Sequence, residues 1–269
     1  MSTAGRDQYL LGLQLNGFCV VEDVIPADRR EDVCRSIAET VEREGHRHSP
    51  PKGIGFVAGA INYDQSFAPY LADERLMGLA EALLGRHVRI SFTSAIINKP
   101  ESERGDWHAD WPFNQRNAGH IRAPYPDAVF HLTTLWMLST FDPENGGTLV
   151  LPGSHRLQTN PTAGGEVDPN QPLPTERNAA GNAGSVLVMD SRLWHSVSPN
   201  RSNRPRVALA VRYAPWWLNV EVLRPGSDER RRMVDEVGGN DNEVPSLPRQ
   251  VFERLPQEVK RLYRHWVVD

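Results

Sequence analysis

The chain has 269 residues, of which 39% are hydrophobic, and this is enough to bury one sizeable core. The 34 acidic residues outnumber the 30 Lys and Arg residues, and a net charge of −4 argues against a nucleic-acid-binding protein. Two cysteines are too few for a disulfide framework. The sequence also opens without a signal-peptide pattern and contains no membrane-length apolar run, so we expect a soluble, cytoplasmic protein.

The first third of the sequence is predicted to be mainly helical. Apolar residues recur at helical spacing in three segments, and each of these segments ends at a glycine. The expected elements are helices over 7–17, 27–45 and 73–85, a strand over 18–24, and a Gly- and Pro-rich loop over 46–59.

The remainder is predicted to be rich in β-structure. Short β-branched runs bounded by turn residues cover 87–100, 128–141, 147–155, 184–198 and 206–215. Helices followed by strands, without βαβ alternation, indicate an α+β protein whose strands form a sandwich or a barrel. We expect one domain over 1–269, with N-terminal helices to about 85, a β-core over about 86–215 and a C-terminal helical segment over about 226–269, where 255–268 forms a helix.

Two long polar segments interrupt the β-rich part, at 114–127 and 157–183. Loops of this length are usually functional lids or disordered segments. The sequence alone leaves both alternatives open.

The segment GDWHADWPF, residues 105–113, places a histidine and an aspartate two residues apart. On a strand, side chains at this spacing point to the same face, so His108 and Asp110 could bind one metal ion together. Taken alone, the pair fits two polar residues on an edge strand better than a metal site.

A second segment adds a further histidine and an arginine. His195 follows a β-rich run and lies beside Trp194, and Arg206 follows eleven residues later at the start of the next run. Two histidines and one carboxylate are the ligand set of non-haem Fe(II) oxygenases, and they leave positions open for a 2-oxo acid and dioxygen. An arginine could bind the far carboxylate of that acid through its planar fork, although Arg206 could also be a surface ion-pair partner.

Several motifs together resemble one known family. They are WHADWPF at 107–113, LWMLSTFDPENGGTLVLPGSHR at 135–156 and WHSVSPNRSNRPRVALAVRYAP at 194–215, with NGFCVVEDVIPADRREDV at 16–33 as a similar opening. In this combination and order the sequence resembles the phytanoyl-CoA dioxygenase (PhyH) family of Fe(II)- and 2-oxoglutarate-dependent oxygenases.

The resemblance implies a double-stranded β-helix, a cupin-like jelly roll with flanking helices. By motif position, it implies that His108, Asp110 and His195 bind Fe(II) and that Arg206 binds 2-oxoglutarate, with dioxygen as the second cosubstrate. Trp136 falls where relatives have a tryptophan lining the cosubstrate pocket, but it could also belong to the core. His155 fits a structural role in its turn better than a catalytic one.

We therefore expect a dioxygenase that oxidises, most simply by hydroxylation, a small-molecule or natural-product substrate. No basic cluster near the expected site points to coenzyme A. The alternative is a non-catalytic jelly roll that binds a ligand or metal. The oligomeric state and the substrate do not follow from the sequence.

Overall fold

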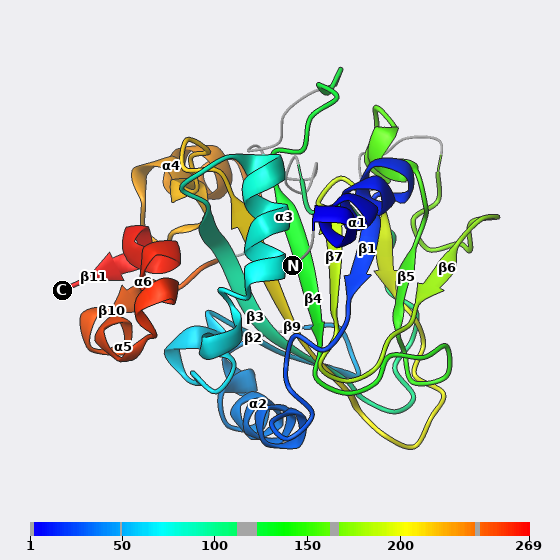
Figure 1. Ribbon diagram of the computed structural model, residues 1–269, viewed down its shortest axis with the longest axis horizontal. Helices are drawn as coiled ribbons and strands as arrows, with labels where there is room; N and C mark the ends of the chain where they lie inside the picture. Colours follow the sequence, from blue (N-terminus) through cyan, green and yellow to red (C-terminus); the bar gives the residue numbers. More distant parts are fainter. Residues whose placement is uncertain (1–2, 49, 112–122, 162–166, 240–242) are drawn as a thin grey trace.

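The computed structural model describes residues 3–48, 50–111, 123–161, 167–239 and 243–269. Figure 1 shows a larger antiparallel sheet with strand order β2-β3-β9-β4-β7-β1 and a smaller one with order β6-β5-β8. The strands of these sheets are β1 (Phe18–Val21), β2 (Ile54–Ala58), β3 (Arg89–Asn98), β4 (Leu132–Met137), β5 (Thr148–Val150), β6 (Arg177–Ala179), β7 (Val186–Asp190), β8 (His195–Val197) and β9 (Arg206–Ala214).

The two sheets face each other across an apolar interior. On β4, Leu135 and Met137 contribute to this interior, together with Val150 of β5 and Ala179 of β6. The intervening Trp136 belongs instead to the core on the outer face of the larger sheet, because successive side chains on a strand point to opposite faces. This architecture confirms the predicted jelly roll.

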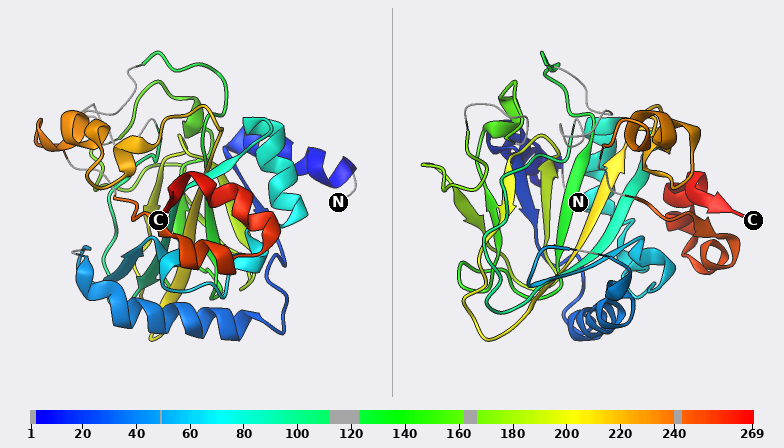
Figure 2. Two further views of the ribbon diagram at one scale, coloured as in Figure 1. Left: turned by 90° about the vertical axis from the view of Figure 1, so that its left-hand side faces the viewer. Right: turned by 180° about the vertical axis from the view of Figure 1, so that it is seen from behind.

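Helices cover the outer face of the larger sheet (Figures 1 and 2). The α-helices of the described residues are α1 (Thr3–Asn16), α2 (Arg30–Glu44), α3 (Glu74–Leu84), α4 (Asp228–Arg230), α5 (Arg249–Arg254) and α6 (Gln257–Tyr263). Helix α1 contacts β1 and β7, α2 contacts β2, β3 and β9, and α6 contacts β3. No helix among the described residues is long and apolar enough to cross a membrane.

The start of α3 illustrates how local chemistry positions these helices. The Asp73 carboxylate accepts hydrogen bonds from the backbone N–H groups of Arg75 at 2.9 Å and Leu76 at 3.3 Å, which caps the helix. Leu76 and Leu79 then lie on the buried face of the helix.

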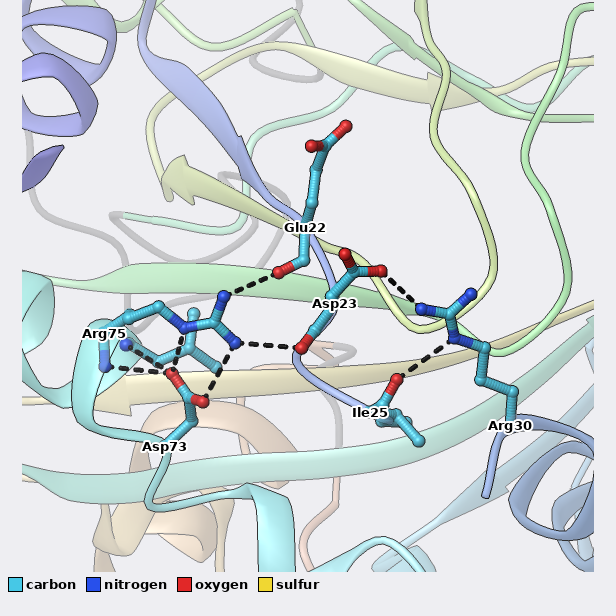
Figure 3. Close-up of polar contacts among 7 residues, drawn as sticks. Glu22, Asp23, Ile25, Arg30, Asp73 and Arg75 are labelled. Carbon is cyan, nitrogen blue, oxygen red and sulfur yellow. Dashed lines mark hydrogen bonds and ion pairs between the residues drawn. The ribbon is translucent and has the colours of Figure 1, made fainter. Parts of the chain in front are cut away.

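The linker between β1 and α2 is held by two arginines (Figure 3). Arg75 donates to the carbonyl oxygens of Glu22 at 2.7 Å and Asp23 at 3.0 Å. Arg30 donates to the Ile25 carbonyl oxygen at 3.1 Å and pairs with the Asp23 carboxylate. These contacts connect the end of the edge strand to two helices that flank the sheet.

Two strands lie where the sequence predicts loops. Strand β2, within the predicted loop 46–59, pairs along its whole length with β3, and β6, within 157–183, pairs with β5. Both are edge strands, and neither shows a clear alternation of apolar and polar residues. The periodicity that reveals a half-buried strand is therefore missing from both segments.

The other predicted segments differ less from the structure. Parts of the two polar segments, 114–122 and 162–166, lie outside the described residues. The predicted C-terminal helix ends at Tyr263, because Val267 and Val268 form β11 (Val267–Val268), which pairs with β10 (Leu247–Pro248). The β-rich run 184–198 forms two strands, β7 and β8, and its middle crosses from the larger sheet to the smaller one.

Candidate active site

The structure brings His108, Asp110 and His195 together, with one potential ligand atom of each within 4.8 Å of the others. His108 and His195 form an isolated antiparallel bridge in which each backbone N–H donates to the other's carbonyl oxygen, at 3.0 and 2.9 Å. Asp110 is fixed next to this bridge, because its backbone N–H donates to the Ser191 carbonyl oxygen at 2.8 Å. The three residues thus converge from two chain segments that are far apart in the sequence.

Hydrogen bonds fix the orientation of both imidazole rings. The Nδ1 of His108 lies 2.9 Å from the Asp106 carbonyl oxygen, and the Nδ1 of His195 lies 2.9 Å from that of Leu193. A carbonyl oxygen can only accept, so each Nδ1 carries a hydrogen, and in the neutral ring Nε2 is then the nitrogen that can bind a metal. Metal-binding histidines are commonly oriented in this way.

The ionisation states of the cluster suit a metal cation. Burial lowers the pKa of His195 to about 4, so its imidazole is neutral near neutral pH. Burial opposes ionisation of Asp110, but Arg212, the two histidines and a hydrogen bond from Thr133 hold the pKa of this carboxyl well below its usual range. Neutral imidazole nitrogens and a carboxylate oxygen form the donor set expected for Fe(II).

Arg206 lies on the same strand as Arg212, six residues earlier, and is only 2% exposed. Its Nε donates to the Gly146 carbonyl oxygen at 2.9 Å, and its guanidinium carbon lies 4.6 Å from the centre of the Phe141 ring. Within the described parts of the chain no carboxylate pairs with it, and burial lowers its pKa to about 10. A buried guanidinium without an acidic partner is a suitable site for the carboxylate of a ligand.

Gly146, from the ENGG stretch, shapes the environment of Arg206. It has a positive φ of +80°, and a Cβ at this position would lie 2.0 Å from the Asn98 amide nitrogen. Both Asn98 Nδ2 and Arg206 Nε donate to its carbonyl oxygen. The glycine therefore permits the close approach that holds the start of β9 against this turn.

The structure does not bring Trp136 to the interior. It is buried on the outer face of β4, and its indole Nε1 donates to Thr134 Oγ1 at 3.0 Å. The inward positions on β4 are Thr133, Leu135 and Met137. Trp136 is therefore a core residue and does not line the interior, because it alternates along the strand with the inward-facing Leu135 and Met137.

His155, for which the sequence predicts a structural role, lies outside the cluster. His155 is buried in its turn, where its Nε2 lies 3.3 Å from the Gln14 carbonyl oxygen of α1. Trp217 is 50% exposed and packs edge-on against Phe130, which packs in the same way against the buried Trp111 next to Asp110. An aromatic row therefore runs from the metal-ligand segment to the surface.

Comparison with known proteins places this geometry in a family. The model of the family described as phytanoyl-CoA dioxygenase matches residues 13–208. Dioxygenase af480 of Aspergillus fumigatus is 31% identical over 202 residues, which cover 74% of this chain and 55% of that protein. The chain thus matches about half the length of that relative.

Two solved structures share the fold. The epimerase SnoN, in complex with Fe3+, alpha ketoglutarate and nogalamycin RO, superposes with a TM-score of 0.62 at 20% identity, covering 80% of this chain and 85% of SnoN. HygX from Streptomyces hygroscopicus, with nickel and 2-oxoglutarate bound, superposes with a TM-score of 0.59 at 17% identity. The superposition covers 79% of this chain and 88% of HygX. The match of the family model over most of the chain shows that the chain belongs to the phytanoyl-CoA dioxygenase family.

Proposed function

We propose that this chain hydroxylates a carbon atom of a small-molecule or natural-product substrate, with 2-oxoglutarate and dioxygen as cosubstrates and succinate and CO2 as by-products. The observation that carries the proposal is the buried Arg206, which has no acidic partner among the described residues and lies on the strand that also supplies Arg212 to Asp110. A protein that only binds metal has no need for such an anion-binding group. This favours an oxygenase over a non-catalytic jelly roll.

In this proposal each residue has a defined task. His108, Asp110 and His195 hold Fe(II), and Arg206 binds the far carboxylate of 2-oxoglutarate. Iron bound there would couple the reduction of dioxygen to the decarboxylation of 2-oxoglutarate and to the oxidation of the substrate. Side chains such as Leu187 keep water out of the interior between the sheets, and this strengthens the charge interactions of Arg206.

The substrate class is proposed from the surroundings and from the relatives. The half-buried Phe130 and the exposed Trp217 form the accessible end of the row that begins at the buried Trp111, next to Asp110. Aromatic surfaces of this kind bind uncharged ring systems or hydrocarbon chains. The structurally similar SnoN was solved in complex with nogalamycin RO. These two observations support a small-molecule substrate of predominantly apolar character.

The decisive test measures succinate formation with Fe(II), 2-oxoglutarate and dioxygen over a library of small molecules. We expect at least one apolar compound to stimulate succinate release. The variants His108→Ala and His195→Ala should lose this activity while they remain folded, because each lacks one of three protein ligands. Wild-type succinate release in both variants would show that the ligands are misassigned, and a metal-binding protein that never consumes 2-oxoglutarate would favour the non-catalytic alternative.

A further inference from the structure

Each oxygen of the Asp110 carboxylate is held by a different donor. Arg212 Nη2 donates to Oδ1 at 2.5 Å, and Thr133 Oγ1 donates to Oδ2 at 2.7 Å. Oδ2 also lies 3.7 Å from His195 Nε2, too far for a hydrogen bond. Of the two oxygens, Oδ2 therefore faces the imidazole while Oδ1 is bound to the guanidinium.

The register of the sheet sets the positions of the two donors. Thr133 on β4 lies directly opposite Arg212 on β9, so both side chains project from the same face at neighbouring points. The Arg212 guanidinium carbon also lies 4.5 Å from the centre of the Phe92 ring, and Phe92 is its partner on β3. This packing restricts the arginine to the orientation that reaches Oδ1.

A chain of hydrogen bonds continues behind Thr133. Its hydroxyl lies 2.9 Å from that of Ser191, which lies 2.8 Å from His131 Nδ1. On the other side of the ring, His131 Nε2 lies 2.7 Å from the Ser91 hydroxyl. His131 and both serines are buried.

The direction of every hydrogen bond in this chain follows from its end at the carboxylate. Because a carboxylate only accepts, Thr133 donates to Asp110 and must in turn accept from Ser191. Ser191 then accepts from His131 Nδ1–H, so the neutral ring accepts at Nε2 from Ser91. All donors point toward Asp110, and aligned hydrogen bonds of this kind polarise and strengthen one another.

We propose that Arg212 and Thr133 are positioning residues that present Asp110 to the metal through Oδ2 alone, with Ser191, His131 and Ser91 fixing the Thr133 hydroxyl. A carboxylate can bind a metal through one oxygen or through both. Holding Oδ1 on the guanidinium prevents the second mode and leaves one more coordination position for the cosubstrates. The inference rests on the proposed iron site and adds to it the residues that determine how its carboxylate binds.

The first test uses Thr133 and its neighbour on the same strand. Thr133→Val removes the donor to Oδ2 with little change in volume and should weaken Co(II) and Fe(II) binding by about 10- to 100-fold, the usual effect of losing such a partner. Thr133→Ser should restore binding. Thr134→Val is the matched control, because Thr134 is equally buried but donates to the Val211 carbonyl oxygen.

The second test addresses Arg212 by the visible absorption spectrum of bound Co(II), which reports coordination number. Arg212→Met should weaken Co(II) binding and also change the spectrum, as Oδ1 becomes free to bind, and Arg212→Lys should partly restore both. The matched control is Arg224→Met: the side chains of Arg212 and Arg224 are 15% and 19% exposed, and Arg224 stacks at 5.0 Å on Trp266, away from the site.

The outcomes separate this inference from the proposed function. If the wild-type chain binds neither metal, the iron site itself is wrong, and the positioning role fails with it. If the wild-type chain binds and both Thr133→Val and Arg212→Met keep its affinity and spectrum, only the positioning role is overturned. Equal losses in the variants and their controls would indicate general destabilisation and would also overturn it.

Discussion

At the scale of single residues, the central feature of this protein is a pair of arginines on strand β9 with different partners: Arg206 is buried and Arg212 is half-buried. Arg212 has a carboxylate of the protein, Asp110, at 2.5 Å. Arg206 donates to a backbone carbonyl oxygen and packs against an aromatic ring, and within the described segments it pairs with no carboxylate. Burying a cation is costly unless an anion compensates for the lost hydration. The fold therefore supplies an anion to Arg212 and, among the described residues, none to Arg206.

The first residue-scale prediction concerns Arg206. Arg206→Met should weaken 2-oxoglutarate binding by on the order of 2–5 kcal/mol, roughly 30-fold or more, because a buried charge-assisted pair is lost. Arg204→Met, a substitution of an exposed arginine two residues earlier, is the control and should leave affinity unchanged. Isothermal titration of the metal-loaded proteins under anaerobic conditions measures both. An affinity of Arg206→Met equal to wild type would exclude the carboxylate-binding role.

How far the sequence predicts the site can be seen from particular residues. The spacing of His108 and Asp110 predicts a shared face, and the structure brings both to His195. Arg212 and Thr133 could not be found from spacing, because they meet Asp110 through strand register, which is set across the sheet. Arg206 and Arg212 lie six residues apart on β9, so their side chains point to the same face of the sheet. This spacing is the one feature of the sequence that indicates a place for Arg212 near the site. In LTTLWML the mixture of apolar residues on both faces gives no alternation, so the side of Trp136 was not predictable.

At the scale of secondary-structure elements, the turn before β7 supports the linker that follows β1. The carbonyl oxygen of Gly184 accepts hydrogen bonds from the N–H groups of Val24 and Ile25, at 2.8 and 3.0 Å. Gly184 has a φ of +88°, and a Cβ there would lie 2.5 Å from both Arg30 Nε and the Ile25 carbonyl oxygen. The linker and the turn can therefore only pack together when this position is glycine.

The element-scale prediction follows from this contact. Gly184→Ala should lower the free energy of unfolding by about 2–4 kcal/mol, because backbone strain adds to a clash with backbone atoms. Gly226→Ala is the control for strain alone: its φ is +73°, and nothing lies within 4 Å of an added Cβ. We expect this control to lose only about 1 kcal/mol. Urea unfolding measures both, and equal losses would contradict the proposed packing.

The helices and long strands were predicted more accurately than the edges of the sheets, for a physical reason. Helix α3 buries one face, and this imposes a helical periodicity on its sequence. Strand β9 is buried on both faces, and this gives it a nearly continuous apolar run. Edge strands such as β2 and β6 gain their stability from backbone hydrogen bonds on one side, which any residue except proline can make. Their sequences are therefore less constrained.

At the scale of the whole molecule, the buried His131 and the half-buried His265 couple stability to pH. Burial and the charge of Arg212 lower the pKa of His131 to about 3, and burial and the charge of Arg89 lower that of His265 to about 3. Both start from an ordinary value of 6.5, so between pH 6.5 and pH 3 the unfolded chain binds protons that the folded chain does not. Stability must therefore fall as the pH decreases through this window.

The corresponding prediction is a steep acid dependence of unfolding in the metal-free protein. Well below pH 6.5 each histidine should lower the free energy of unfolding by roughly 1.4 kcal/mol per pH unit, and the lowered pKa of Asp110 acts in the same direction only at still lower pH. The variant His265→Gln tests the assignment, because it removes one of these protons at a position away from the metal ligands. Urea unfolding between pH 7.5 and 4.5 gives the free energy of unfolding as a function of pH. At the acid end of this range, the slope for this variant should be shallower than that of wild type by the equivalent of about one proton. If the two slopes coincide, His265 takes up a proton in the folded state as readily as in the unfolded one, and the acid sensitivity must come from other groups.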